Sequence, residues 1–406
     1  MGTRGRVNAG ERCCGCGTCA AVCPRGCIEM SEDACGFVWP LVDGALCVDC
    51  GACAVACPVM MAADAHCGTA SEGATCSFPM AWWARARDAE LVLGSSSGGL
   101  FGLLARDVLS RGGVVYGAAF TEGCRSVRHV RATAEDDLLR IMKSKYVQST
   151  VGPGVYRALG DDMRAGIPIL FSGTPCQVAG ARAYLFSRRV ESGASKDESV
   201  LLVDVICHGV PAPAVWGART DGVRDRLGSS LAEVDFRDKK TGWENYSVTY
   251  RADNGRAKSN LWDRDWFMAA FLQNASLRTS CFSCPCRGEG THASDITLGD
   301  FWGVRGAHPE VEAGAGVSAV IVRTEAGERA FERVATEVHR GRSSVDSIAA
   351  GNPSLCKQPS PHPQRDAFLG AVASGGDARY LQRNWGFGLT FGDRARRVLK
   401  RFLLER

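Results

Sequence analysis

The sequence predicts an α/β protein with a small α+β unit at its N-terminus. Eleven of the twenty cysteines fall before residue 60, in closely spaced runs, and short apolar runs alternate with helical patterns after residue 89. Two of the apolar runs, residues 167–171 and 200–206, are followed by Cys176 and Cys207. Buried parallel strands have this appearance. We therefore expect a mixed or parallel sheet with a site at one edge.

The N-terminal unit holds two copies of the pattern C-x2-C-x2-C-x3-C-P, at residues 13–24 and 47–58. Bacterial ferredoxins with two 4Fe–4S clusters carry this pattern, and in them the fourth cysteine ligates the other cluster. Zinc sites suit such triple runs poorly. We expect a short hairpin between the runs. The expected ligands are Cys13, Cys16, Cys19 and Cys57 for the first cluster, and Cys47, Cys50, Cys53 and Cys23 for the second.

Length and composition bound the class of protein. With 406 residues, 45% of them hydrophobic and 23% charged, the chain has the composition of a globular protein of two or three domains. The net charge of +4 is too small to indicate a nucleic-acid partner. No apolar run reaches the ~20 residues of a membrane helix, so we expect no transmembrane segment. Thiols in cluster spacing indicate a reducing compartment, the cytoplasm.

Composition divides the chain into four segments. We expect a two-cluster ferredoxin-like 4Fe–4S domain at residues 1–70, a linker at 71–88, an α/β domain at 89–345, with parts 89–165 and 166–345, and a C-terminal extension at 346–406. One amphipathic helix is expected within residues 320–350, with Ala330, Phe331, Val334 and Val338 on its apolar face. Residues 394–404 form a basic amphipathic pattern, which suits weak contact with an anionic membrane surface or a solvated terminal helix.

Two loops have the composition of an anion site. Residues 95–99, Ser-Ser-Ser-Gly-Gly, precede a helical pattern, and the N-terminus of a helix suits a phosphate; an ordinary capped helix has the same pattern. Residues 143–149 contain two lysines, a tyrosine and a glutamine, which suit an anionic cofactor, although an isolated segment of this kind is more often a solvated loop. Neither motif decides the matter alone.

A third metal site is expected in the α/β domain. Residues 281–286 supply a further C-x2-C pair, and with Cys176 and Cys207 the thiols reach the four that a cubane needs. A zinc site with the same four thiolates is the competing interpretation, and spacing does not separate the two. The glycine-rich aromatic turn at residues 299–303 suits either a wall for a planar ring or ordinary packing.

These motifs occur in one order from about Cys13 to about Pro361. After the two cysteine runs come Ser-Ser-Gly-Gly, Ser-Lys-Tyr-Val-Gln-Ser, Gly-Thr-Pro-Cys-Gln, Ile-Cys-His-Gly, Phe-Arg-Asp-Lys-x-x-Gly-Trp, Cys-x2-Cys-Pro and Asp-Ile-Thr-Leu-Gly-Asp-Phe-Trp-Gly. In this order they resemble the beta-subunit family of coenzyme F420 hydrogenases and dehydrogenases, in its bacterial form fused to a ferredoxin.

The resemblance implies that the α/β domain binds FAD and one 4Fe–4S cluster, which favours iron–sulfur over zinc. The implied cluster ligands are Cys176, Cys207, Cys281 and Cys284. The implied flavin contacts are Ser97, Gly98, Gly99, Lys145, Tyr146 and Gln148, with Thr174 nearby. Cys286 departs from the family, in which an aromatic residue usually follows Cys-Pro, and it competes with Cys281 and Cys284 as a ligand.

The predicted function is that of an enzyme, an iron–sulfur flavin oxidoreductase. It passes electrons between a ferredoxin-type donor or another redox protein, the 4Fe–4S clusters and FAD, coupled to a two-electron acceptor or donor. A small or precursor molecule is the expected substrate. The first alternative is an electron-transfer subunit of a larger complex, with no substrate of its own. A zinc-binding structural module is the least favoured interpretation.

Overall fold

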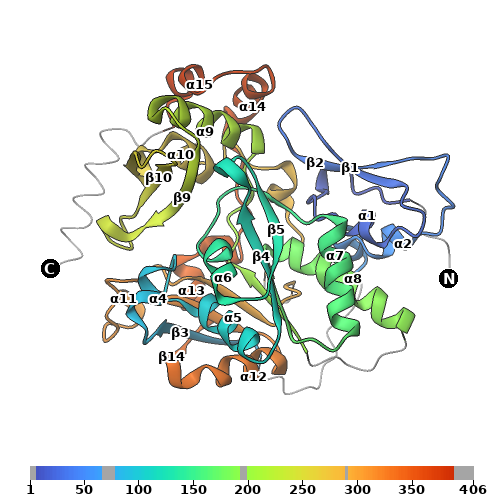
Figure 1. The fold of residues 1–406 in the computed structure, drawn as a ribbon, viewed down its shortest axis with the longest axis horizontal. Helices are drawn as coiled ribbons and strands as arrows, with labels where there is room; N and C mark the ends of the chain where they lie inside the picture. Colours follow the sequence, from blue (N-terminus) through green and yellow to red (C-terminus); the bar gives the residue numbers. More distant parts are fainter. Residues whose placement is uncertain (1–5, 66–77, 193–198, 289–290, 388–406) are drawn as a thin grey trace.

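A nine-stranded mixed sheet forms the centre of the computed structural model, which describes residues 6–65, 78–192, 199–288 and 291–387 (Figure 1). In spatial order the strands are β14 (Val338–Ser343), β3 (Met80–Ala86), β13 (Ser318–Val322), β12 (Ile296–Asp300), β8 (Val200–Val205), β7 (Ile169–Gly173), β4 (Val114–Phe120), β5 (Val127–Ala132) and β6 (Ser149–Thr150). β12, β8, β7 and β4 pair in parallel, so their carboxyl ends meet at one edge. The predicted α/β class and mixed sheet are confirmed.

The two faces of this sheet are covered by different helices. The helices are α5 (Leu100–Ser110) and α12 (Glu325–Arg333) on one face, and α7 (Pro153–Arg164) and α8 (Pro175–Ser192) on the other. Successive residues of β7 alternate between the faces, because Leu170 packs with α5, whereas Ile169 and Phe171 pack with α7 and α8. Burial on both faces explains why the first three residues of this strand are apolar.

Two predicted boundaries differ from the structure. Residues 80–86 fall in the predicted linker, but they form β3, which pairs antiparallel with β13 and β14. Small buried residues such as Ala84 let this strand pack on both sides, and no local signal marks its distant partners. The helix predicted within residues 320–350 is α12 and ends at Arg333. Val338 begins β14 instead, because its backbone pairs with Ala86.

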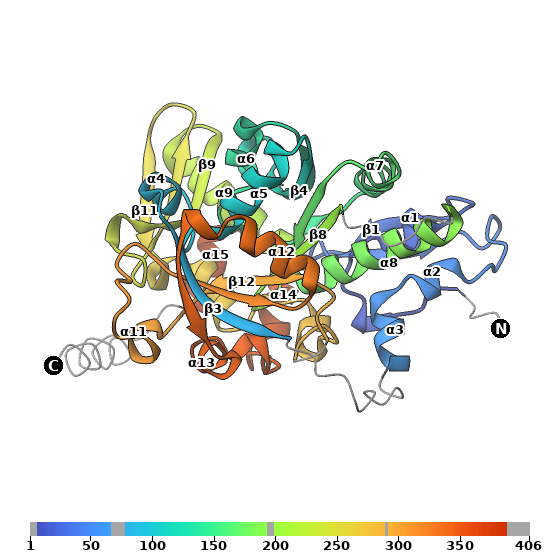
Figure 2. The same cartoon turned by 90° about the horizontal axis from the view of Figure 1, so that it is seen from below.

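The N-terminal unit, residues 6–65, has short helices and one hairpin. Its elements are η1 (Gly10–Arg12), α1 (Thr18–Val22), β1 (Ile28–Glu32), β2 (Val38–Val42), α2 (Ala52–Val55) and α3 (Pro58–Ala65). β1 and β2 form the antiparallel hairpin expected between the cysteine runs. Figure 2 shows the unit lying beside α8, with α1 next to that helix.

The N-terminal unit packs closely on the α/β domain. The Tyr156 hydroxyl of α7 donates to the carbonyl of Cys16 at 2.8 Å and lies 3.0 Å from the Thr18 hydroxyl of α1. On α8, a Cβ at Gly180 would lie 2.4 Å from the Thr18 hydroxyl and 3.2 Å from the Cys16 sulfur. Since a glycine is required for this approach, α1 rests directly on the helix that follows β7.

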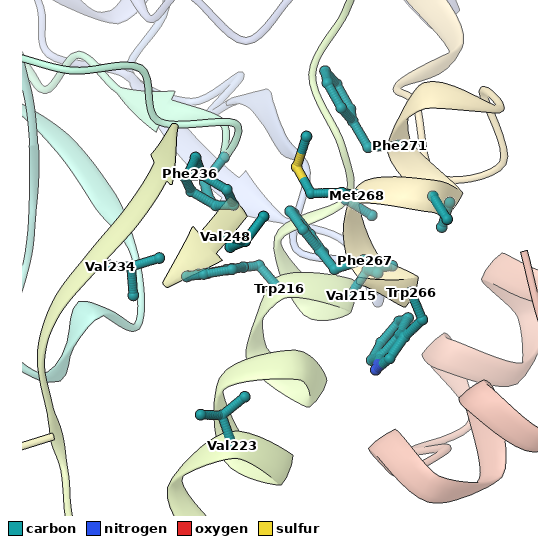
Figure 3. Packing of buried hydrophobic residues seen from close by; sticks show 14 of the residues in the cluster. Val215, Trp216, Val223, Val234, Phe236, Val248, Trp266, Phe267, Met268 and Phe271 are labelled. Atoms are coloured by element: carbon teal, nitrogen blue, oxygen red, sulfur yellow. The ribbon is translucent and has the colours of Figure 1, made fainter. Parts of the chain in front are cut away.

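A second hydrophobic core lies beside the large sheet and surrounds Trp216 (Figure 3). Its elements are the three-stranded sheet β11 (Ala257–Leu261), β10 (Ser247–Ala252), β9 (Leu231–Asp238), and the helices α9 (Pro213–Leu227), α10 (Trp266–Leu272), α14 (Arg365–Ala373) and α15 (Ala378–Trp385). Trp216 is fully buried, its indole N–H donates to the carbonyl of Cys124 at 2.8 Å, and its ring lies 4.9 Å from that of Phe267. This core carries β9, which reaches the candidate site.

Part of the predicted C-terminal extension packs into this second core, because α14 and α15 contribute Phe368, Leu369 and Leu381. The predicted basic helix at residues 394–404 lies outside the described residues. The remaining helices are α4 (Ala89–Leu93), α6 (Glu135–Ile141), α11 (Val304–Ala307) and α13 (Val345–Gly351), with five further 3-10 turns, η2 (Glu122–Cys124), η3 (Lys239–Thr241), η4 (Trp262–Arg264), η6 (Ala335–Glu337) and η7 (Pro353–Leu355). Within the described ranges, every helix is too short or too polar to cross a lipid bilayer.

Candidate functional site

A cavity of about 490 Å³ lies at the edge of the sheet where the parallel strands end. Gly117 of β4, Gly173 of β7, Val205 of β8 and Asp300 of β12 all line it. In open α/β sheets, ligands bind outside the carboxyl ends of the strands. Small-molecule and cofactor sites have volumes of roughly 300–1,000 Å³, so this cavity has the place and size of a ligand site.

The loop before α5 forms one wall of the cavity, with residues 95–97 and 99–101 in the lining. Gly99 has a φ of 88°, which glycine adopts without strain. Gly98 lies against β3, where a Cβ would be 2.5 Å from the carbonyl oxygen of Ala84. The first N–H groups of a helix have no partner within it, so this wall suits an anion such as phosphate.

Lys145 also lines the cavity. Its ammonium donates to the carbonyls of Met142 at 2.7 Å and Lys143 at 3.2 Å. Burial lowers the pKa of Lys145 to about 7, and the nearby charge of Lys143 lowers it further, although Asp235 opposes the shift. Lys143 itself pairs with Asp235 at 2.6 Å. Because Lys145 has no such carboxylate partner among the described residues, an anionic ligand would stabilise its charged form.

Arg237 of β9 brings aromatic rings to the cavity. It pairs with both oxygens of Asp300, at 2.7 and 3.1 Å, and lies over the rings of Tyr246 at 4.1 Å and Trp302 at 4.9 Å. Burial opposes its charge, but Asp300 together with Tyr146 and Tyr246 outweighs burial and raises the pKa of Arg237. Arg237 also donates to the Tyr146 hydroxyl at 3.3 Å. The result is a rigid wall of rings held by a buried ion pair.

The residues predicted to contact a flavin fall into two groups. Five of them line the cavity: Ser97, Gly99, Lys145, Tyr146 and Thr174. The other two point elsewhere. Gly98 packs on β3 and donates to the Ser318 hydroxyl at 3.0 Å, while the side-chain amide of Gln148 donates to the carbonyl of Cys14, in the N-terminal unit, at 3.3 Å. Val147 and Ser149 on either side of Gln148 line the cavity, but the Gln148 side chain contacts the docked unit instead.

A second, smaller cavity of about 40 Å³ gathers cysteines from three parts of the α/β domain and one from the N-terminal unit. The cysteines that line it are Cys14, Cys176, Cys207, Cys281, Cys284 and Cys286. Cys176 begins α8 after β7, Cys207 follows β8, and the other three lie in and after η5 (Thr279–Ser283). The four ligands implied by the resemblance are therefore neighbours, and so is Cys286.

The polar groups of this smaller cavity are the kind that suit an anionic cluster. His292 lines it, its Nδ1 lies 2.6 Å from the carboxylate of the fully buried Asp204, and its Nε2 has no hydrogen-bond partner among the described residues. Arg278 also lines it, and its Nη1 likewise has no partner in the described part of the chain. Arg287 donates to the carbonyl of Cys207 at 2.8 Å. Thiols surrounded by buried nitrogen donors fit a thiolate-bound iron–sulfur cluster.

The cysteines of the N-terminal unit form two further groups. A cavity of about 20 Å³ is lined by Cys23, Cys47, Cys50 and Cys53, together with Cys27. Cys57 lies with the first run: burial raises the pKa of the Cys19 thiol, and the thiols of Cys16, Cys13 and Cys57 raise it further. The fourth cysteine of each run thus lies with the other run. Cys57 lies with the first run, and Cys23 lies with the second.

The cysteine groups differ from sites for a single metal ion. Among the residues that the structure describes, no three His, Cys, Asp or Glu side chains are arranged to hold one metal ion. A cubane separates its four ligand sulfurs more widely than one tetrahedral ion does, so this finding concerns mononuclear sites.

Sequence reasoning missed several residues of both cavities. Cys14, His292 and Arg278 line the cysteine cavity, and Asp300 and Arg237 shape the larger one. Cys14 is next to a predicted ligand but outside its spacing pattern, so the pattern gave no reason to select it. Arg278 precedes the C-x2-C pair by three residues and carried no signal of its own. The aromatic turn at residues 299–303 was the one available hint, and its Trp302 does line the larger cavity.

Part of the chain matches a known family model. Residues 168–343 match the family model described as the C terminus of the beta subunit of coenzyme F420 hydrogenase/dehydrogenase. A solved structure, the xenon-derivatised F420-reducing nickel–iron hydrogenase complex from Methanosarcina barkeri, contains a chain similar to this one. The similarity covers 75% of this chain and 90% of that chain, with 16% sequence identity and a TM-score of 0.44. No curated protein matches the sequence.

Proposed function

Residues 168–343 belong to the beta-subunit family of coenzyme F420 hydrogenases and dehydrogenases, and from this premise we propose that the protein is an iron–sulfur flavoprotein oxidoreductase. In this proposal it exchanges electrons with a ferredoxin-type donor or another redox protein, and a small or precursor molecule is its two-electron acceptor or donor. The clusters supply single-electron transfer, and FAD supplies the exchange between one and two electrons. The activity belongs in a reducing compartment, because its ligands are free thiols.

The observation that carries the proposal is the shared wall of the two cavities. Cys207 lines both of them, and so do Ile206, Gly209, Val210 and Ser354. A cysteine-bound group in the smaller cavity and an organic cofactor in the larger one would therefore be separated by one short segment, the loop that follows β8. Neighbouring redox groups are what electron transfer requires, and a structural zinc site has no use for such a cavity beside it.

Different residues that line the larger cavity suit different parts of FAD. The N-terminus of α5 and Lys145 suit the diphosphate, since both favour negative charge. Tyr246 and Trp302, held by Arg237, suit the planar ring system. The hydroxyl of Ser97 is already used, because it donates to the carbonyl of Val317 at 2.8 Å. We therefore assign the backbone of Ser97, and not its side chain, to the phosphate wall.

We propose three 4Fe–4S clusters on the same reasoning. The ligands would be Cys13, Cys16, Cys19 and Cys57 for the first, Cys47, Cys50, Cys53 and Cys23 for the second, and Cys176, Cys207, Cys281 and Cys284 for the third. Burial raises the pKa of the Cys207 thiol well above its usual value. Metal binding must therefore supply the positive charge that makes this thiol a thiolate ligand.

A second candidate function is an electron-transfer subunit that docks on a catalytic partner. The observation that favours it is a set of exposed apolar side chains on the N-terminal unit. Their relative exposures are 62% for Leu41, 49% for Leu46, 59% for Val48, 53% for Val55 and 40% for Met61. Val48 also lines the cavity of the second cysteine run. Apolar surface around a redox site suits contact with another redox protein.

Anaerobic purification with metal, sulfide and flavin analysis tests the proposal. Four irons in each cubane predict about twelve irons and one FAD per chain. The variant Cys207→Ser is expected to lose about four of these irons, whereas the matched variant Cys35→Ser keeps all of them, because the Cys35 thiol donates to the carbonyl of Leu369 and lines none of the three cavities. Eight irons together with zinc, or a chain that binds no flavin, would contradict the proposal. Co-purification of a stoichiometric redox subunit would favour the second candidate.

A further inference from the structure

Arg278 is a fully buried side chain that joins the α/β domain to the N-terminal unit. Its own carbonyl accepts from the backbone N–H of Cys281 at 3.0 Å. Its side chain crosses into the other unit, where Nε donates to the carbonyl of Cys13 at 2.7 Å and Nη2 donates to that of Val38 at 2.8 Å. The guanidinium also lies 4.1 Å from the ring centroid of Trp39. Arg278 thus lies between a cysteine of the third group and a cysteine of the first.

The charge of Arg278 lacks a protein counter-charge in these contacts. Its hydrogen bonds go to backbone carbonyls, and its Nη1 has no hydrogen-bond partner within the described ranges. Arg219 offers a comparison, because it is almost as buried but pairs with Asp265 at 2.6 Å. A guanidinium stays protonated, and burial of an uncompensated charge is strongly destabilising. Something else must therefore balance Arg278.

The thiol groups on either side of Arg278 identify what balances it. Arg278 lines the cysteine cavity of the α/β domain. On its other side, its Nε donates to the backbone carbonyl of Cys13, the first cysteine of the N-terminal runs, at 2.7 Å. A 4Fe–4S cluster held by four thiolates carries net negative charge in both of its usual oxidation states. Two such clusters would surround this cation with the negative charge that the protein itself does not provide.

We propose that Arg278 is a charge-compensating and positioning residue shared by the first and third clusters, and that it raises the reduction potentials of both. This inference rests on the proposed function, because it requires the clusters to be present. A cluster becomes more negative when it is reduced, so a fixed neighbouring cation stabilises the reduced form. Electrons entering at the second cluster would then be drawn inward, towards the flavin cavity.

Among the described residues, no buried cation lines the second cluster site, and its Arg25 is exposed. Arg6 lines it, but the Arg6 side chain is 44% exposed and pairs with Asp49 at 2.7 Å. Solvent and salt screen exposed charges of this kind. The second cluster is therefore an internal control for any change made at Arg278.

Redox titration of the reconstituted full-length holoprotein, followed by electron paramagnetic resonance, tests the inference. Variants Cys50→Ser and Cys207→Ser assign the signals of the second and third clusters. In Arg278→Met we expect the midpoint potentials of the first and third clusters to shift to more negative values, while that of the second cluster stays unchanged. Arg278→Lys keeps the charge without the fork of donors, so its shift is expected to be smaller. Arg219→Lys, the matched control, lowers the melting temperature without moving any potential.

The possible results separate this inference from the proposed function. Fewer than about twelve irons in the wild-type protein would remove the third cluster, and both proposals would fall together. With about twelve irons present, equal potentials in wild type and Arg278→Met would overturn the inference alone, and so would an equal shift of all three clusters. Loss of cluster iron from both Arg278→Met and Arg278→Lys would also overturn it, because the cysteine ligands remain and the residue would then serve assembly.

Discussion

Replacing Lys145 with methionine tests whether the larger cavity binds the diphosphate of FAD. Methionine keeps most of the length and apolar surface of the lysine stem but removes its charge. A hydrogen bond to a charged group contributes roughly 1.5–3 kcal/mol. Since each ~1.4 kcal/mol is a tenfold change in affinity, the Kd for FAD is expected to rise about 10- to 100-fold in Lys145→Met at pH 6.

The effect depends on pH in a defined direction. Burial and the charge of Lys143 lower the pKa of Lys145 to about 7, against the opposing influence of Asp235 and Cys124. At pH 6 the ammonium of the free protein is charged and ready to pair with a phosphate. At pH 9 it is neutral and must take up a proton on binding, which offsets part of the gain. Wild-type affinity for FAD is therefore expected to fall from pH 6 to pH 9, and the difference from Lys145→Met to narrow.

Flavin fluorescence titration of the flavin-depleted protein measures both effects. Riboflavin is the matched ligand, because it has the ring system without the diphosphate, and its affinity is expected to be the same in wild type and variant. Lys240→Met, at an exposed lysine that does not line the cavity, is the matched protein control. An equal loss of affinity for FAD and riboflavin, or a loss that does not change between pH 6 and pH 9, would refute the assignment of Lys145 to the diphosphate.

Three further predictions concern the ring wall, the second core and the apoprotein. Trp302→Ala is expected to weaken FAD and riboflavin alike, by about tenfold, in the same titration; a loss confined to FAD would contradict a ring contact. Trp216→Ala should lower the free energy of unfolding, measured by urea denaturation, by about 3–5 kcal/mol. The reason is that its ring is fully buried at the centre of the second core (Figure 3). A loss below about 1 kcal/mol would contradict this, because it would mean that neighbouring side chains fill the cavity. Because the pKa of Lys145 is lowered, the folded apoprotein binds fewer protons than the unfolded chain above about pH 7. Its unfolding free energy should therefore rise from about pH 7 towards pH 10. Thermal melts of Lys145→Met over the same pH range should lack that rise.

The parallel strands were predictable because their signal is local. The apolar residues of β7 and β8 are buried on both faces, which leaves the hydrophobic runs Ile169–Phe171 and Val200–Val203 in the sequence. Parallel neighbours place their carboxyl ends at one edge, so Cys176 and Cys207 were expected to be neighbours, and both line the cysteine cavity. The α/β class followed from the same reasoning. Motif order then identified the family over residues 168–343.

The features that sequence reasoning missed depend on contacts between distant segments. β3 looks like part of a linker until β13 and β14 pair with it. Gln148 lies in a loop that suits an anionic cofactor, but the docked N-terminal unit provides its partner, the carbonyl of Cys14. Arg278 reads as an ordinary charged residue, and its burial follows only from that docking. Residue type and spacing carry no information about which surfaces of two units will meet.

The packing of the N-terminal unit explains why the three cysteine groups can act together. A ferredoxin on a flexible tether would visit many positions, and its distance from the α/β domain would depend on the linker. Here α1 lies on α7 and α8, and a Cβ at Gly17 would be 2.7 Å from the carbonyl oxygen of Val151. Tyr156 donates to the carbonyl of Cys16, and Arg278 donates to that of Cys13. Because both side chains bind the backbone of the first cysteine run, the fold sets the position of that run relative to the third group. In the second run Cys50 is exposed, so a redox partner could approach it.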